Sequence, residues 1–212
     1  MKFRTRYVMI AHSRENKMLY IYILLIIIFV YDIYIGAKFF EYVYCVNIKH
    51  QPPLVASASC LRQATVEQIV KYYNKSKNIC EIGSGFGGLA RAVAKQTKAN
   101  VYALENMPFS AFVSKLCDLL SWCKNNHTIW GDAFKFLDKT NKKFDVAIAY
   151  LGPTLTPNIQ QYKSKIRVLI SLDFEIKGLK PVRIIDMSKN GCTVYNKIEY
   201  SHKLFVYNLT DM

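Results

Sequence analysis

The sequence predicts an α/β domain with a doubly wound, mainly parallel sheet, preceded by one N-terminal transmembrane helix. Three observations support this prediction. An apolar run near the N-terminus is long enough to cross a bilayer. Beyond it, helix-like and strand-like patterns alternate along the rest of the chain. A glycine-rich turn, Gly83–Gly87, directly follows the first short apolar strand of that alternation.

The size and charge of the chain limit its function classes. Its 212 residues suffice for one full α/β domain with an appendage, but not for two large domains. With 51% hydrophobic and 21% charged residues, a packed core is expected and wholesale disorder is not. The net charge of +14 favours a polyanionic partner, either nucleic acid, an anionic membrane or an acidic protein surface. Because the basic residues are scattered, background composition is an equal alternative.

The six cysteines and four histidines are dispersed, with no Cys-x-x-Cys pair and no zinc-ligand spacing. We therefore expect no metal site. A reduced domain on the cytosolic side of a membrane is the simplest account of these cysteines.

Residues 18–37 form the predicted transmembrane helix. They include one charge, Asp32, and tyrosines near both ends suit the two bilayer interfaces. A secretory signal peptide is the main alternative, but it would have a shorter apolar region followed by a small-x-small cleavage site. A buried globular helix is a weaker alternative, because Leu19–Val30 shows no polar face.

This helix divides the chain into a basic leader (1–17), an aromatic-rich juxtamembrane linker (38–53) and a folded domain (54–212). The linker either runs along the membrane surface or continues the helix. The leader carries five Lys and Arg residues, which favour a cytoplasmic N-terminus and an exported domain. If Met18 is the true start, the leader is absent and the opposite orientation is favoured.

Within the domain, hydrophobic periodicity predicts the elements in order. The first helix, Thr65–Tyr73, begins with a threonine N-cap and has one apolar face. Further helices are expected at Leu89–Lys95, Pro108–Lys124 and Asn158–Lys165. Strands are expected at Asn78–Ile82, Asn100–Leu104, His127–Trp130, Phe144–Leu151, Arg167–Phe174, Arg183–Met187 and Lys203–Asn208. The last two strands, joined without a helix, predict an antiparallel edge.

The segment Glu81-Ile82-Gly83-Ser84-Gly85-Phe86-Gly87 carries the clearest chemical signal. Glycines at alternate positions let the backbone turn tightly and approach a ligand without interference from a Cβ atom. The spacing is G-x-G-x-G, and Glu81 lies two positions before the first glycine. This combination favours S-adenosylmethionine (SAM) over a dinucleotide, because SAM has no pyrophosphate for the helix N-terminus to hold.

Two further acids follow later strands. Glu105 ends the next strand, 24 residues after Glu81, where a carboxylate can accept both ribose hydroxyls. Asp132, followed by Ala133, comes just past the third strand, where an acidic side chain and a backbone amide can read an adenine edge. Alternatively, Glu105 is a surface acid at a strand end and Asp132 a turn or N-cap residue. Their order along the sheet favours a ligand site.

The glycine motif, Glu105 and Asp132 resemble motif I and the two following acidic motifs of class I (seven-strand) SAM-dependent methyltransferases. The resemblance implies a Rossmann-like methyltransferase sheet with SAM as cofactor. The implied cofactor-binding residues are Glu81, Gly83, Ser84, Gly85, Gly87, Glu105, Asn106, Asp132 and Ala133. The chain departs from the pattern at Phe86, where an acidic residue is common, and at Asn106-Met107-Pro108, where Asn-Pro is expected.

Nearly the whole chain further resembles the small membrane-anchored protein-lysine methyltransferases, whose mitochondrial members modify the adenine nucleotide translocase and the ATP synthase c-subunit. Pro53–Ala58 loosely matches that family's proline-rich segment, although two prolines are missing. Tyr150–Pro153 matches a Tyr-Leu-x-Pro element, and Phe174–Gly178 matches a Phe-x-Ile-x-Gly run. The resemblance implies methylation of a lysine in a membrane protein, with the domain on the cytosolic, SAM-containing side.

Methyl transfer from a sulfonium is an in-line displacement by a neutral amine, so positioning does most of the work. A desolvated aromatic pocket lowers the pKa of the substrate lysine. Tyr150 is the predicted pocket residue and Asp173 the predicted orienting acid, with a strand-end tyrosine and a surface acid as the alternatives. A nucleic-acid methyltransferase, a small-molecule or lipid methyltransferase and a non-catalytic SAM-fold protein are alternative functions. For a nucleic-acid methyltransferase, the sequence lacks the Asn-Pro-Pro-Tyr-type element that binds a base amine.

Overall fold

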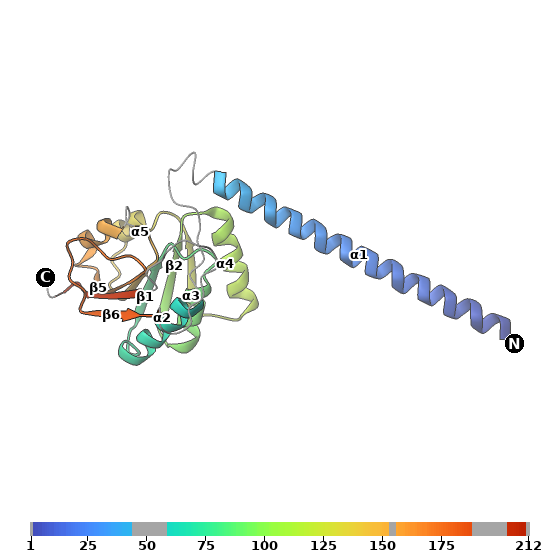
Figure 1. Cartoon of the computed structure of the whole chain (residues 1–212), viewed down its shortest axis with the longest axis horizontal. Coiled ribbons are helices and arrows are strands. Elements are labelled where there is room, and N and C mark those ends of the chain that lie inside the picture. Colours follow the sequence, from blue (N-terminus) through green and yellow to red (C-terminus); the bar gives the residue numbers. More distant parts are fainter. Residues whose placement is uncertain (1, 44–58, 153–155, 188–202, 211–212) are drawn as a thin grey trace. The chain divides into compact units, whose positions relative to one another are not determined.

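The computed structural model describes residues 2–43, 59–152, 156–187 and 203–210 (Figure 1). The chain divides into two compact units, Met1–Pro53 and Leu54–Met212. The predicted proline-rich match at 53–58 and most of the predicted linker, residues 44–53, lie outside the described residues.

The first unit contains one long helix, α1 (Lys2–Val43). Within it, Lys17–Phe40 has a mean hydropathy of 2.4 and is long enough to cross a bilayer. A helix suits that environment because it satisfies its own backbone hydrogen bonds. The helix continues without a break past residue 37 to Val43, so the start of the predicted linker is helical.

The second unit contains a seven-stranded sheet in the order β3-β2-β1-β4-β5-β7-β6. Its strands are β1 (Asn78–Ile82), β2 (Asn100–Glu105), β3 (Asn126–Trp130), β4 (Phe144–Ala149), β5 (Ile166–Leu172), β6 (Arg183–Asp186) and β7 (Lys203–Asn208). Strands β1 to β5 pair in parallel, whereas β7 pairs antiparallel with both β5 and β6. Each predicted strand is present and the antiparallel edge is confirmed, with β7 alone running against the other strands. Strands β4 and β5 end two residues earlier than predicted, at Ala149 and Leu172.

Helices cover both faces of this sheet. They are α2 (Ser59–Tyr72), α3 (Gly88–Gln96), α4 (Pro108–Leu120), α5 (Ala133–Lys139) and the 3-10 helix η2 (Thr156–Tyr162). Alternate strand residues such as Ile79 and Val146 pack with α2 and α3, and their neighbours Cys80 and Ala147 pack in a second cluster with α5 and η2. These two clusters make the doubly wound prediction correct.

Several element boundaries differ from the predictions. Helix α2 begins six residues before Thr65, which is buried inside it and donates its hydroxyl to the Leu61 carbonyl, 2.7 Å away. Thr65 is therefore not an N-cap. Helix α4 ends at Leu120 rather than Lys124, because Trp122 has a left-handed backbone with φ of 52°.

The predicted α-helix Asn158–Lys165 was wrong in type and length. The structure has the short 3-10 helix η2 instead, and β5 begins at Ile166. Tertiary contacts hold this region, because the Tyr162 ring stacks on Phe134 of α5 with centroids 5.9 Å apart. Helix α5 itself was not predicted, because its seven residues are too few to show a clear helical period.

A polar network joins α3 and α4 to the edge strand β3. Nη1 of Arg91 lies 3.2 Å from Oδ1 of Asp118, and both side chains are largely buried. Asp118 also accepts hydrogen bonds from Asn126 and from Thr128 of β3. The Ser114 hydroxyl lies 2.8 Å from that of Thr128. This network of paired charges and hydrogen bonds attaches α4 to the sheet, and the fully buried residues of α4 are all small.

The cysteines differ from the expectation of a fully reduced domain. Cys80, Cys117 and Cys123 are free, but Cys60 at the start of α2 is disulfide-bonded. Disulfides persist mainly in oxidising compartments, so this bond bears on the orientation of the domain.

Candidate cofactor and substrate site

The turn after β1 depends on its glycines. Gly83, Gly85 and Gly87 have φ values of 74°, 55° and 68°, a left-handed conformation that side chains with a Cβ atom rarely adopt. The backbone amides of Gly83 and Ser84 donate to the carbonyl of Leu104 in β2. A Cβ atom on Gly87 would also lie 2.2 Å from the Ser114 hydroxyl oxygen. Both backbone conformation and packing therefore require glycine here.

Glu105 is the acid on which this turn rests. It is the last residue of β2 and is 5% exposed, so it is not a surface acid. Its Oε2 accepts a hydrogen bond from the Gly85 amide at 2.6 Å, and its Oε1 accepts one from the Met107 amide at 2.7 Å. One carboxylate thus joins the glycine turn to the chain that enters α4.

Glu81 lies buried one strand away and supports α3. Its Oε2 accepts a hydrogen bond from the Ala90 amide at 2.9 Å, which satisfies a donor in the first turn of that helix. Burial raises the pKa of Glu81 to about 8; the Ala90 hydrogen bond opposes this shift, and the negative charge of Glu105 adds to it. The Glu81 carboxyl therefore holds a proton near neutral pH.

Two further polar side chains belong to this region: Ser84, which was among the predicted cofactor residues, and Arg91, which was not. The Ser84 hydroxyl is buried and has no hydrogen-bond partner among the described residues. An unmet buried hydroxyl costs about 1–3 kcal/mol, so its presence favours a ligand that bonds to it. Arg91 donates to the Phe86 carbonyl at 2.6 Å and fixes the turn from outside. A single sequence gives no signal for Arg91, because its partners lie on α4 and in the turn itself.

The residues after β2 and β3 lie at the same carboxyl edge of the sheet. Asp132 is the N-cap of α5, and its Oδ1 accepts hydrogen bonds from the amides of Phe134 and Lys135 at 2.8 and 3.2 Å. Asp132 is therefore an N-cap residue, as the alternative interpretation of the sequence expected, and its Oδ1 is the capping atom. Ala133 is the first residue of α5, and the carbonyl of Asn106 accepts a hydrogen bond from the Trp130 indole.

The two predicted substrate residues follow neighbouring strands. Tyr150 comes directly after β4, and Asp173 directly after β5, with Ala149 paired to Ser171. The Tyr150 ring stacks on Phe174, with centroids 6.1 Å apart, and Asp173 is 7% exposed. Asp173 has a φ of 62°, a conformation uncommon for residues other than glycine.

Leu151 connects the predicted substrate residues, Tyr150 and Asp173, to the glycine turn. Its side chain would lie 3.2 Å from a Cβ atom on Gly83. The structure thus brings the ends of β1, β2, β4 and β5 to one edge of the sheet, where open α/β sheets bind their ligands. Pro153 of the predicted Tyr-Leu-x-Pro element lies outside the described residues.

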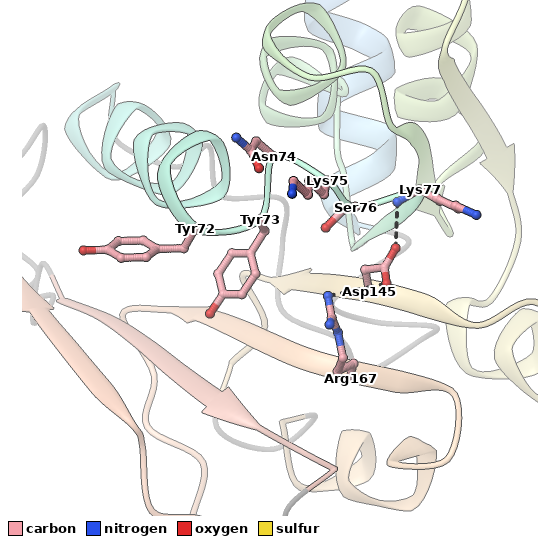
Figure 2. Close-up of a pocket in the computed structure, with 8 residues that line it drawn as sticks. All are labelled: Tyr72, Tyr73, Asn74, Lys75, Ser76, Lys77, Asp145 and Arg167. Atoms are coloured by element: carbon pink, nitrogen blue, oxygen red, sulfur yellow. Dashed lines mark hydrogen bonds and ion pairs between the residues drawn. The ribbon is translucent and has the colours of Figure 1, made fainter.

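A polar hollow of about 360 Å³ lies at the opposite, amino edge of the sheet (Figure 2). Its floor includes Asp145, whose Oδ2 accepts a hydrogen bond from the Lys77 amide at 2.7 Å and whose Oδ1 lies 3.5 Å from Nη2 of Arg167. Asp145 therefore ties together the starts of β1, β4 and β5, which is a structural role. The described residues contain no cluster of three or more His, Cys, Asp and Glu side chains suited to a metal ion.

Comparison with known proteins identifies the fold of the second unit. No protein-family model and no curated protein sequence matches the chain. An RNA methyltransferase from Salinibacter ruber, solved with S-adenosyl-L-homocysteine, aligns with a TM-score of 0.59 at 15% identity, covering 74% of this chain and 95% of its own. M. capricolum TrmK, also solved with S-adenosyl-homocysteine, aligns with a TM-score of 0.50 at 16% identity, covering 69% and 68%. The domain has the class I methyltransferase fold.

The buried proton on Glu81 predicts a pH dependence of stability. The pKa of this carboxyl is about 8 in the folded chain, against an ordinary value of 4.5 for glutamate. Between these values the folded state holds more protons than the unfolded state, so the free energy of unfolding falls as pH rises through that window. Glu81→Gln keeps an acceptor oxygen for Ala90 and does not titrate. Thermal unfolding of the full chain in detergent should therefore vary less with pH in this variant than in the wild type.

The exposed Glu67 provides the control. Glu67→Gln should leave the wild-type pH profile unchanged. Parallel profiles for Glu81→Gln and wild type would show that Glu81 does not hold this proton.

Proposed function

We propose that this chain is a membrane-anchored, SAM-dependent methyltransferase that methylates a lysine of a membrane protein. The observation that carries the proposal is the 2.6 Å hydrogen bond between the Gly85 amide and the buried Glu105 carboxylate, at the carboxyl edge of a class I methyltransferase sheet. Two solved proteins that share this fold were crystallised with the SAM product S-adenosyl-homocysteine.

The residues at this edge fit the parts of SAM. A carboxylate oxygen has two lone pairs, so Glu105 can accept ribose hydroxyls while it keeps its bonds to Gly85 and Met107. The unmatched Ser84 hydroxyl and the open backbone of the glycine turn suit the methionine end. Oδ2 of Asp132 and the amide of Ala133 suit the adenine edge. Bound SAM supplies an electrophilic methyl group.

The group after β4 and β5 fits an amine substrate. The stacked rings of Tyr150 and Phe174 offer an apolar surface that lowers the pKa of a lysine lying against it. The Tyr150 hydroxyl would accept a hydrogen bond from the amine, and the buried Asp173 would orient it. The resemblance to membrane-anchored lysine methyltransferases and the apolar helix α1 support a membrane protein as the substrate.

RNA is the second candidate substrate. It is favoured by the net charge of +14 and by the RNA methyltransferase from Salinibacter ruber that shares this fold. Lysine is preferred because an aromatic pair and a buried acid suit an amine.

Cofactor binding tests the first step of the proposal. Glu105→Ala removes charge-assisted hydrogen bonds worth about 1.5–3 kcal/mol, so SAM affinity measured by calorimetry should fall roughly ten- to a hundredfold. Gly85→Arg should abolish binding, because the turn then has a side chain at a left-handed position. Glu175→Ala, which changes an exposed acid after β5, is the matched control. Unchanged affinity in Glu105→Ala would mean that this acid only supports the turn.

Methyl transfer tests the substrate. The full chain is incubated with radiolabelled SAM and with membrane protein, soluble protein and RNA fractions. We expect the label in membrane protein, recovered as methyl-lysine after hydrolysis. Tyr150→Phe should lower the rate by about tenfold at unchanged SAM affinity, since one positioned hydrogen bond is lost. Tyr102→Phe, which alters a ring packed on His127 and Phe144, should change neither quantity.

Other distributions of label contradict the lysine proposal. Label in RNA would support the second candidate. Label in lipid or small molecules would indicate a different acceptor, and no transfer despite SAM binding would indicate a non-catalytic protein.

The orientation of the domain is the last part of the proposal. The basic leader and the disulfide at Cys60 favour an exported domain, whereas a SAM-dependent enzyme needs the cytosolic cofactor pool. We propose that the cofactor requirement decides and that the domain faces the cytosol. Alkaline phosphatase fused to the C-terminus should then be inactive in a bacterial host. Strong phosphatase activity would place the domain outside and overturn the enzyme proposal.

A further inference from the structure

Helix α4 presents its apolar residues outward and its small polar residues inward. Its buried residues are Ser110, Ala111 and Ser114. Phe109 and Val113 are half-buried, whereas the other large apolar residues, one at position 112 and the rest four, seven and eight positions later, share one side of the helix and are exposed. Together with Trp122, which follows the helix and is 82% exposed, they form what we call the α4 face: Phe112, Leu116, Leu119, Leu120 and Trp122. A helix on the surface of a soluble domain normally has the opposite arrangement.

The polar network behind α4 explains how this arrangement is stable. Arg91, Asp118 and Thr128 hold the helix on the sheet through an ion pair and hydrogen bonds. The α4 face is therefore not needed to attach the helix to the domain. Leu119 is 73% exposed and Leu120 is 70% exposed, and contiguous apolar surface of this kind marks a site of interaction.

The chain segment that contains α4 is positively charged. Between Gly88 and Gly131 the only acids are Glu105, which is buried, and Asp118, which is paired with Arg91. Four lysines in the same stretch are exposed: Lys95, Lys98, Lys115 and Lys124. The partner of this face must therefore accept apolar side chains and carry negative charge beside them.

We propose that the α4 face lies in the headgroup region of the bilayer that α1 spans. Anionic lipid provides both required features, since tryptophan and leucine enter the boundary of the acyl chains while lysines contact phosphates. The 15 residues between Val43 and Ser59 extend over at most roughly 55 Å, so an inserted α1 keeps the domain close to the lipid surface. This inference rests on the proposed membrane anchoring.

Lipid contact at α4 would also set the distance between the cofactor site and the membrane surface. The helix begins at Pro108, one residue after Met107, whose amide is bonded to Glu105. Leu119 and Leu120 lie at the other end of this 13-residue helix, so a domain that contacts lipid along α4 keeps the end of β2 within roughly 20 Å of the headgroups, the length of the helix. The α4 face is separate from the residues proposed to bind SAM.

Trp122 is the probe that tests this proposal. The full chain with Trp130→Phe retains Trp122 as its single tryptophan. It is reconstituted into vesicles of phosphatidylcholine and phosphatidylglycerol, with acyl chains brominated near the headgroup or unbrominated. If Trp122 lies at the boundary described above, its emission should be blue-shifted and should fall by about half in brominated lipid.

Matched variants separate the face from the anchor. Leu119→Glu with Leu120→Glu should restore the emission intensity while the protein still floats with the vesicles and keeps its SAM affinity. Val182→Glu with Ile184→Glu changes two exposed apolar residues at the start of the edge strand β6, and it should leave the quenching intact. Equal loss of quenching in both pairs would overturn the assignment to α4.

The remaining outcomes also decide. Flotation with vesicles but no quenching of Trp122 would overturn the lipid contact and leave the anchor standing. A chain that does not float would overturn both. If Trp122 shows a blue shift without quenching, the protein is also measured in lipid nanodiscs that each hold one chain. Loss of the blue shift there would identify a second copy of the chain as the occupant of the α4 face. A blue shift without quenching that persists there would also contradict lipid contact.

Discussion

The buried carboxylate of Glu105 is the interaction on which the site depends. It accepts hydrogen bonds from Gly85 on one side and Met107 on the other, and so it fixes the turn after β1 against the start of α4. The carboxylate thus supplies a hydrogen-bond acceptor for both of these backbone amides, which lie outside the regular strands and helices. This side chain thus joins the turn, β2 and the start of α4, beside the Gly83 and Ser84 bonds to Leu104 and the Arg91–Asp118 pair.

The sequence predicted the parts of the fold that local rules determine. Parallel strands end at one edge, so Glu105 and Asp132 could be placed there from their positions after short apolar runs. Tyr150 and Phe174 were expected at the ends of two strands, and the structure has them just past β4 and β5, where their rings stack.

The missed features are those that distant contacts determine. Thr65 has the residue type of an N-cap, but the helix before it extends because Leu61 and Ala64 are buried against the core. Helix α5 is too short to show a period, and η2 is held by the ring of Tyr162. The polar network of Arg91 and Asp118 was likewise hidden, since its members are separated by 27 positions. No pattern within one element could show that α4 would turn its apolar side outward.

The elevated pKa of Glu81 has a consequence for how the site meets a ligand. A buried neutral carboxyl is a stored proton rather than a fixed charge. A ligand that brought a positive group to Glu81 would favour the ionised form and release that proton to solvent. Occupancy of the site and the acidity of the surrounding water would then be thermodynamically linked, so the chain would take up a cationic ligand more readily as its compartment became more alkaline.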